Sequence, residues 1–260
     1  RKFKRYGELR GLKTRKYFGK AKDDDYSKEG LWDFRLWKRW TKNDGMVRWK
    51  SPFGDGRPGW HIECSAMATH YLGDSFDIHC GGSDNIFPHH ENEIAQSEAA
   101  SGRSLANFWL HAKHLTVGKK KMSKRTGNVL YVSQLRKEGV PPRCLRFYLI
   151  SKRYRSPLDF TIESFGDEVC DCKRVREMME GLRKTDRPGP GRYGESVSRK
   201  LMEGFESAMD DDLDTGLAFR RIFWRFREIK GMMAGKKLTS NDARKILRVM
   251  EKIDSVLGVF

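Results

Sequence analysis

The sequence predicts an α/β fold with a parallel sheet, followed by an all-α helical bundle. Two observations lead to this fold class. Between residues 59 and 117, segments with helical character alternate with short apolar segments typical of strands. That alternation is what a parallel sheet with crossover helices requires. From about residue 132 to the last residue, apolar side chains recur at helical spacing instead, which predicts a separate helical region.

The elements of the α/β part follow one another in a simple order. Residues 1–58 are charged and rich in tryptophan, and Gly and Pro cluster over 51–59. The spacing then predicts a helix over 61–71 that ends at Gly73, and a buried strand over 75–78. A second helix is expected from Pro88, as its first residue, to about Gly102. A short strand is predicted over 114–117.

The helical part begins after a loop that is rich in lysine. Its helices are predicted over 132–137, 142–151, 165–183, 196–209, 215–234 and 240–257. Residues 185–191 carry two Pro and two Gly and are expected to form a loop. Asp214 or Thr215 is the expected N-cap of the helix over 215–234, and Ser240 or Asn241 that of the last helix.

Composition limits the classes of function. The chain has 260 residues and a formal net charge of +17, which indicates a polyanionic partner such as a nucleic acid. Five cysteines at irregular spacing argue against a disulfide framework and for a reducing compartment, so we expect a cytoplasmic protein. No apolar run approaches the about 18 residues of a membrane span, so no membrane partner is expected.

Three residues have the chemistry of a metal site. Cys64 is followed by His89 and Glu93, which are four residues apart and would project from one face of the predicted helix. A thiolate, an imidazole and a carboxylate are ligands that suit zinc. The alternative is a small buried cysteine beside an ordinary helical contact. All seven histidines lie between His61 and His114, which favours a built site.

A second motif follows about thirty residues later. Lys121, Met122, Ser123, Lys124 and Arg125 are preceded by two further lysines and followed by Thr-Gly-Asn, which favours a loop. Two lysines and a hydroxyl on a loop suit the charge that develops on a triphosphate under attack. Most basic runs, however, are solvated surface or nucleic-acid patches.

With both motifs in place, the chain resembles the cysteinyl-tRNA synthetases, a family of class I aminoacyl-tRNA synthetases. The resemblance spans nearly the whole sequence. It rests on the two motifs, within Phe87–Glu93 and Lys121–Arg125, and on these further segments: Asp33–Phe34, Leu36–Lys38, Trp49–Cys64, Phe76–His79, Arg146–Leu149, Tyr154–Leu158 and Ala208–Asp212. It implies that residues 1–117 form the second half of a class I Rossmann-like nucleotide-binding domain. Residues 118–164 would then hold the lysine loop and a stem-contact region, and 165–260 a tRNA-binding bundle.

The resemblance also implies the ligands of the site. Zinc would take the thiolate of the substrate cysteine, and Cys64, His89 and Glu93 match three of the family's four zinc positions. The fourth, a cysteine, and the His-Ile-Gly-His signature that holds ATP normally precede a stretch such as Tyr6–Leu9. Neither has a counterpart here, and the small C-terminal domain of the family is also missing. The chain is therefore expected to be partial, to need a missing N-terminal segment, and to be inactive alone.

The reaction implied by the resemblance joins cysteine to ATP, used with magnesium, and then transfers the cysteinyl group to cysteine tRNA. Lys121 and Lys124 would bind the triphosphate of ATP, with Ser123 shaping the loop. Trp60 is a candidate wall of the cysteine pocket, and Asp84 a candidate partner of its ammonium group. Basic residues of the helix over 215–234 are candidate tRNA contacts, although a solvated helix face is an equal alternative: Arg220, Arg221, Arg225, Arg227 and Lys230.

Two other functions stay open from the sequence. The first is a ligase that joins cysteine to an amino sugar, as in the mycothiol pathway, on the same fold. Glu91-Asn92-Glu93 and the long helical region favour the tRNA enzyme over that ligase. The second is a non-catalytic remnant that keeps only RNA or zinc binding.

Overall fold

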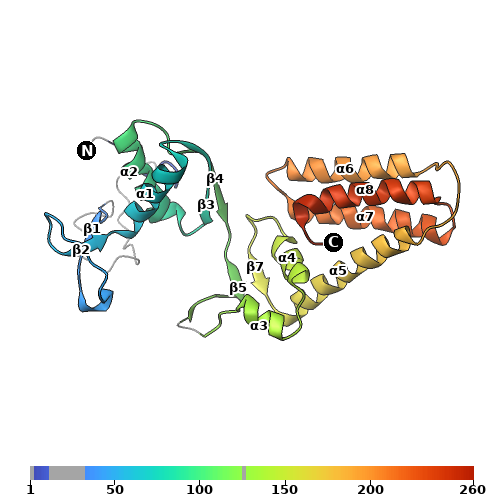
Figure 1. The fold of residues 1–260 in the computed structure, drawn as a ribbon, viewed down its shortest axis with the longest axis horizontal. Helices are drawn as coiled ribbons and strands as arrows, with labels where there is room; N and C mark the ends of the chain where they lie inside the picture. The colour runs from blue at the N-terminus through green and yellow to red at the C-terminus, as the bar shows by residue number, and fades with distance from the viewer. Residues whose placement is uncertain (1–2, 12–32, 125–126) are drawn as a thin grey trace. The chain divides into compact units, whose positions relative to one another are not determined.

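Figure 1 shows the computed structural model, which describes residues 3–11, 33–124 and 127–260. The chain divides into two compact units, Arg1–Ala112 and Lys113–Phe260. We call them the N-terminal unit and the C-terminal unit, and each is described by itself. No helix within the described ranges is long and apolar enough to cross a membrane.

The main part of the N-terminal unit is a helix followed by two parallel strands that a second helix connects. Its elements are β1 (Trp37–Arg39), β2 (Gly56–Pro58), α1 (Trp60–Leu72), β3 (Phe76–Gly82), α2 (Glu91–Ser101) and β4 (Ala106–Ala112). Strands β1 and β2 pair antiparallel, whereas β3 and β4 pair parallel, with Phe76 opposite Ala106. The predicted alternation of helices and strands around a parallel pair is therefore confirmed.

The partner of the first parallel strand differs from the prediction. The strand predicted over 114–117 exists as β5 (Leu115–Val117), but it belongs to a sheet of the C-terminal unit. The parallel partner of β3 is β4, which the sequence pattern did not reveal. Of the seven residues of β4, only Ala106 is buried, and Phe108 is 65% exposed. A strand without an alternating buried face carries no period-2 signal.

The predicted start of α2 at Pro88 is wrong. Pro88 lies in a separate turn, the π-helix Ile86–His90, and α2 begins at Glu91. The His90 N–H donates to the Asn85 carbonyl, five residues earlier, at 2.8 Å, so residues 86–90 form a π-turn and not the first turn of α2. Glu91 and Glu93 occupy the first turn of α2, where negative charge is favourable, and Gly102 ends the helix in the left-handed conformation.

The C-terminal unit begins with a small sheet and continues with helices. Strand β5 pairs antiparallel with β6 (Lys120–Lys121) and parallel with β7 (Leu158–Phe160). The helices are α3 (Val132–Lys137), α4 (Pro142–Ile150), α5 (Ile162–Arg183), α6 (Gly194–Met209), α7 (Thr215–Ala234) and α8 (Ser240–Leu257). Their bounds agree with the predictions to within three residues. Helix α5 begins earlier than predicted because Thr161 caps it, accepting a hydrogen bond from the Ser164 backbone N–H.

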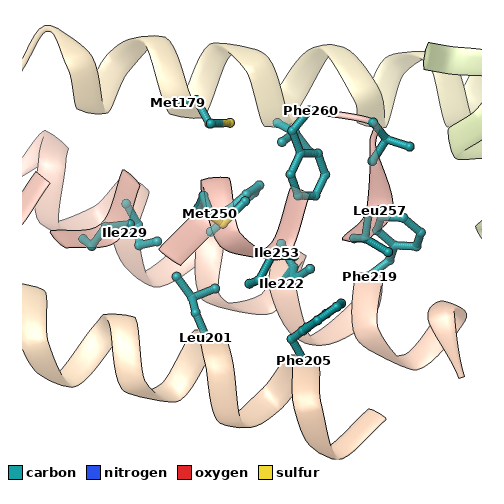
Figure 2. Close-up of a cluster of buried hydrophobic side chains, with 14 of the residues drawn as sticks. Met179, Leu201, Phe205, Phe219, Ile222, Ile229, Met250, Ile253, Leu257 and Phe260 are labelled. Atoms are coloured by element: carbon teal, nitrogen blue, oxygen red, sulfur yellow. The ribbon is translucent and has the colours of Figure 1, made fainter. Parts of the chain in front are cut away.

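The core of this unit lies between helices α5, α6, α7 and α8 (Figure 2). In α8, Ala243, Ile246, Met250, Ile253 and Leu257 are at most 2% exposed and are spaced three or four residues apart. That spacing places them on one face of the helix. They meet apolar side chains of the other helices, including Met179, Leu201, Phe205, Phe219, Ile222 and Ile229.

A buried carboxylate connects the starts of two of these helices. Asp242, 2% exposed, accepts hydrogen bonds on Oδ1 from the backbone N–H groups of Tyr193 and Gly194 at α6. On Oδ2 it accepts from the backbone and the hydroxyl of Thr239. The N-cap of α8 is therefore Thr239, not Ser240 or Asn241 as predicted, because the reciprocal contact with Asp242 requires a three-residue spacing.

The turn between α6 and α7 has a strained backbone and is held by side chains from an earlier part of the chain. Asp212 and Leu213 both have positive φ (53° and 56°), which is unusual for residues other than glycine. The Asp212 carboxylate accepts hydrogen bonds from Tyr154, Arg153 and Arg155. Hydrogen bonds from Arg155 and Tyr154 lower the pKa of Asp212 to about 2. After the turn, Asp214 caps α7 through the Leu217 N–H, as predicted.

Candidate metal centre and lysine loop

The three candidate metal ligands come together in the N-terminal unit. Cys64 lies in α1, His89 in the turn before α2, and Glu93 in the first turn of α2. One ligand atom from each lies within 4.8 Å of the others. His89 and Glu93 are buried and Cys64 is partly buried, so the cluster is screened from bulk solvent.

Glu93 is the centre of the cluster. Its Oε2 accepts a hydrogen bond from His79 Nε2 at 2.6 Å. Its Oε1 lies 2.7 Å from His89 Nε2, yet this buried oxygen has no hydrogen bond of proper geometry. Burial by itself would raise the pKa of Glu93, but the contacts with His79 and His89 outweigh it and lower the pKa to about 2. Glu93 is therefore a carboxylate at neutral pH.

Cys64 is a neutral thiol in these surroundings. Burial, followed by the negative charge of Glu93, raises the pKa of the Cys64 thiol to about 11. A cation placed between the two groups would oppose both effects, because metal ligation deprotonates a thiol. The buried Glu93 oxygen without a hydrogen bond and the sulfur, imidazole and carboxylate donor set both fit a zinc ion.

Neighbouring aromatic side chains orient His89. The Nδ1 atoms of His61 and His89 lie 2.7 Å apart, so the other ring nitrogen of His89 faces Glu93. The indole of Trp60 stacks on the His89 ring, with centroids 4.1 Å apart and planes 21° apart. A partner on the second nitrogen is the usual support of a metal-binding histidine. Trp60 remains 49% exposed, so part of its ring is open to solvent beside the cluster.

A second group of ligand atoms shares Glu93. His79, His90 and Glu93 also offer atoms that lie within 4.8 Å of one another. The His90 Nδ1 is 2.8 Å from His111 Nε2, and burial lowers the pKa of His90 to about 4, so His90 is neutral at pH 7. A supporting role is more common than ligation for histidines such as His61, His79 and His90 near a metal site, whereas no sequence signal assigned a role to His111.

Gly81, near the end of β3, leaves room for the side chain of His90. An added Cβ on Gly81 would lie 2.6 Å from His90 Cε1 and 2.8 Å from its Nε2. Only glycine therefore lets the backbone approach the buried His90 ring. Asp84, the predicted partner of a substrate ammonium, follows on the exposed turn after β3.

The lysine loop lies in the C-terminal unit and begins as a hairpin between β5 and β6. The turn uses Gly118 and Lys119, both with positive φ (56° and 61°). The Asp159 carboxylate of β7 accepts hydrogen bonds from the Lys119 N–H at 2.7 Å and the Thr116 hydroxyl at 2.5 Å. The side chains of Lys121 and Lys124 are exposed. Arg125 lies outside the described residues.

Asn128 holds the far end of the loop, a role that the sequence did not reveal. Its side-chain oxygen accepts a hydrogen bond from the Ser123 N–H at 2.9 Å, and its amide donates to the Lys121 carbonyl at 3.2 Å. Asn128 and Asp159 thus anchor the two ends of a segment whose lysines face solvent. The Thr-Gly-Asn sequence was the only available signal, since Asn is common in turns.

The basic residues of α7 divide between two sides of the helix. Arg221 and Arg225 line a groove toward α6, of about 430 Å³. Arg227 and Lys230 line a larger cavity toward α5, of about 610 Å³, where Asp171 and Glu177 also lie. Arg220 is exposed. The five predicted tRNA contacts therefore do not form one continuous face.

The comparisons with known proteins agree on one family. Residues 1–169 match the model of the class I (C) tRNA synthetase catalytic domain. The chain is 40% identical over 263 residues to a cysteine–tRNA ligase of Chlamydia pneumoniae, covering 99% of this chain and 56% of that protein. It is 39% identical over 265 residues to the same enzyme of Brachyspira hyodysenteriae, with the same two coverages. The chain thus spans a little over half the length of the curated relatives it matches.

Solved structures show the same fold at lower sequence identity. One is a ternary complex of a LeuRS, tRNA and LeuAMS from Agrobacterium radiobacter K84, with a TM-score of 0.59 and 15% identity over 84% of this chain and 34% of that one. Another is a methionyl-tRNA synthetase of Mycobacterium tuberculosis with methionyl-adenylate, with a TM-score of 0.51 and 16% identity over 72% of this chain and 41% of that one. The predicted fold class, the second half of a class I Rossmann-like domain followed by helices, is thereby confirmed.

Proposed function

This chain belongs to the class I (C) tRNA synthetase family, and on that premise we propose that it carries the cysteine-selecting part of a cysteine–tRNA ligase. The observation that supports this most is the convergence of Cys64, His89 and Glu93 within 4.8 Å around a buried carboxylate oxygen that has no hydrogen bond. Relatives at about 40% identity bear the same enzyme name.

The reaction of such an enzyme has two steps. A carboxylate oxygen of cysteine attacks the α-phosphorus of ATP, bound with magnesium, and pyrophosphate leaves with its electron pair. A hydroxyl of the terminal tRNA adenosine then attacks the carbonyl carbon of the adenylate, and AMP leaves. The exposed Lys121 and Lys124 would bring two positive charges to the triphosphate as charge accumulates on the leaving pyrophosphate. Asn128 and Asp159 would limit the motion of the segment that carries them.

Cys64, His89 and Glu93 would hold the zinc ion. When bound, zinc supplies a soft Lewis acid that prefers a thiolate over a hydroxyl, which separates cysteine from serine. The chain's own residues do the rest: His79 and His61 fix Glu93 and His89, and Trp60 forms an aromatic wall beside them. Asp84 stays a candidate for the substrate ammonium. The unpaired cysteines Cys64, Cys80, Cys144 and Cys172 support a reducing, cytoplasmic setting.

Metal content and amino-acid binding test this function. We expect the purified chain to bind about one zinc ion, and the Cys64→Ala and Glu93→Gln variants to lose it. The Cys80→Ser variant is the matched control, since it removes an exposed thiol of β3 outside the three ligands. With cobalt(II) in place of zinc, added cysteine should strengthen the thiolate-to-metal charge-transfer band, and serine should not. By calorimetry, cysteine should bind at least about 100-fold tighter than serine. Equal binding of serine, or metal retained by both ligand variants, would refute the proposal.

A further inference from the structure

The groove between α6 and α7 has an exposed aromatic ring at its edge. Trp224 is 58% exposed, although the bundle that carries it is otherwise well packed. The Arg225 guanidinium lies 4.1 Å from the centroid of the Trp224 ring, a cation–π contact. Glu228 fixes this guanidinium through an ion pair of 2.7 Å. Trp224 is therefore held in place by Arg225 on one face of its ring, and more than half of its surface stays exposed.

The rest of the groove is predominantly basic. Its lining comprises Lys200, Glu203, Gly204 and Ser207 from α6 and Arg221, Trp224 and Arg225 from α7. Three of these side chains are cations and one is a carboxylate, and Glu228 beside the groove pairs with Arg225, so the groove keeps one net positive charge. Arg221 donates a hydrogen bond to the Gly204 carbonyl at 3.0 Å, which fixes one cation across the groove floor.

We propose that this groove binds an unpaired nucleotide of RNA, with the base stacked on Trp224 and its phosphate contacted by Lys200 and Arg221. An aromatic ring beside a row of cations is how proteins hold single-stranded nucleic acid. A volume of about 430 Å³ is sufficient for one nucleotide. The cavity toward α5 has cations and carboxylates as well, but its aromatic residues Phe223 and Phe226 are partly or fully buried, whereas Trp224 is exposed. The inference rests on the proposed function in that tRNA is the expected RNA.

The test compares two RNAs and three variants of the full chain. The probes are a cysteine tRNA transcript, which has unpaired loops, and a blunt RNA duplex of similar length without unpaired bases. Trp224→Leu removes the aromatic face, Trp224→Phe keeps one, and Lys200→Gln removes a phosphate contact. Val256→Ala, at an exposed position of α8, is the control for an unrelated apolar surface residue. Circular dichroism and thermal melts establish that each variant is folded.

We expect Trp224→Leu to weaken tRNA binding by about 5- to 100-fold, as the loss of one base–aromatic stack does, and to leave duplex binding unchanged. Trp224→Phe should bind tRNA nearly as the original chain does. Lys200→Gln should weaken the binding of both RNAs and reduce the magnitude of the slope of log affinity against log salt by about 0.7–0.9. Trp224→Leu should not change this slope.

Two results would overturn the inference. One is a Trp224→Leu chain that binds tRNA as the original chain does, or that weakens tRNA and duplex equally. The other is tight binding of polyglutamate that Trp224→Leu abolishes, which would assign the groove to an acidic protein segment. Zinc and cysteine binding measured on the same variants separate the two proposals. If cysteine binds but the affinity for tRNA does not change in Trp224→Leu, only the proposed nucleotide site is refuted. If cysteine does not bind, the ligase function fails, and the tRNA–duplex comparison still decides the groove.

Discussion

Buried carboxylates in this protein differ in pKa because their donors differ. Glu91 is fully buried and accepts the backbone N–H groups of Gly7 and Arg10. Burial outweighs these two bonds and raises its pKa. Asp242 is also buried, which would raise its pKa, but the hydrogen bonds from Thr239, Gly194 and Tyr193 lower it. The same chemical group is thus pushed in opposite directions by the number of donors around it.

Replacing Asp242 should have a pH-dependent cost. Asp242→Asn should lower the free energy of unfolding by about 1.5–3 kcal/mol at pH 7, since it weakens charge-assisted hydrogen bonds to two helices. Because the folded-state pKa of Asp242 is below its unfolded value of about 3.9, its stabilisation is present above that value. It is lost as the pH falls through the folded pKa. Urea unfolding at a series of pH values should show the gap between the two chains narrowing below about pH 4.

Glu195→Gln is the matched control for Asp242→Asn. Glu195 pairs with Lys245 across the same two helices, at 2.7 Å, but its side chain is 82% exposed. An exposed ion pair contributes little, so this variant should stay within about 1 kcal/mol of the original chain at every pH. Equal stability of Asp242→Asn and the original chain at pH 7 would contradict the role given to Asp242.

Among the elements, those with strong helical periodicity could be predicted and those without it could not. Helices α3, α7 and α8 begin and end where the sequence predicts, since apolar residues at helical spacing are a local signal, although the N-cap of α8 was predicted one or two residues too late. Strand β4 is missed because most of its residues are exposed and only its pairing with β3 makes it a strand. The start of α2 is predicted three residues too early because residues 86–90 form a π-turn, with the His90 N–H bonded to the Asn85 carbonyl.

The candidate site divides in the same way. The contact between His89 and Glu93 could be predicted from their spacing, because the π-turn leads directly into α2 and keeps residues four apart on one side. The contact between His79 and Glu93 comes from β3 packing beside α2, and no local pattern encodes it. Asn128 lies before α3 and Asp159 lies in β7, and both bond to the lysine loop. These contacts form only on folding, so the sequence pattern could not predict them.

Helix α8 should be sensitive to truncation on one face only. Ile246 is fully buried in the bundle core, so Ile246→Ala should lower the free energy of unfolding by about 2–5 kcal/mol through lost burial and the cavity left behind. Val256, on the same helix, is 54% exposed, and Val256→Ala should change the free energy of unfolding by less than about 0.5 kcal/mol. Urea denaturation of both variants measures the difference. Similar losses from both would mean that the packed face of α8 is assigned wrongly.

At the scale of the whole molecule, the candidate metal belongs to one unit and the large apolar core to the other. All three ligands lie within Arg1–Ala112, whereas the bundle core lies within Lys113–Phe260. Removing a bound metal should therefore loosen the first unit and leave the packing of the second unchanged. A ligand at 100 times its dissociation constant contributes about 2.7 kcal/mol to the unit that binds it.

Hydrogen exchange can measure this separation. After a chelator is added, amides of α1 and α2 should exchange faster, by up to about 100-fold, while those of α6, α7 and α8 keep their protection. In the Cys64→Ala chain the chelator should have no effect, because the metal is already absent. Faster exchange in the bundle helices on chelation would show that the two units are not energetically independent.

The turn between α6 and α7 determines which fragments of the helical bundle can be expected to fold alone. Asp212 and Leu213 adopt their left-handed conformations against contacts from Arg153, Tyr154 and Arg155, almost sixty residues earlier in the chain. A fragment starting at α6 would contain the hairpin but not the side chains that hold its tip. Without these side chains, the turn between its first two helices could leave the left-handed conformation at Asp212 and Leu213. An autonomous bundle module must therefore include the segment around Tyr154, and a domain boundary drawn at the first bundle helix would divide a single folding unit.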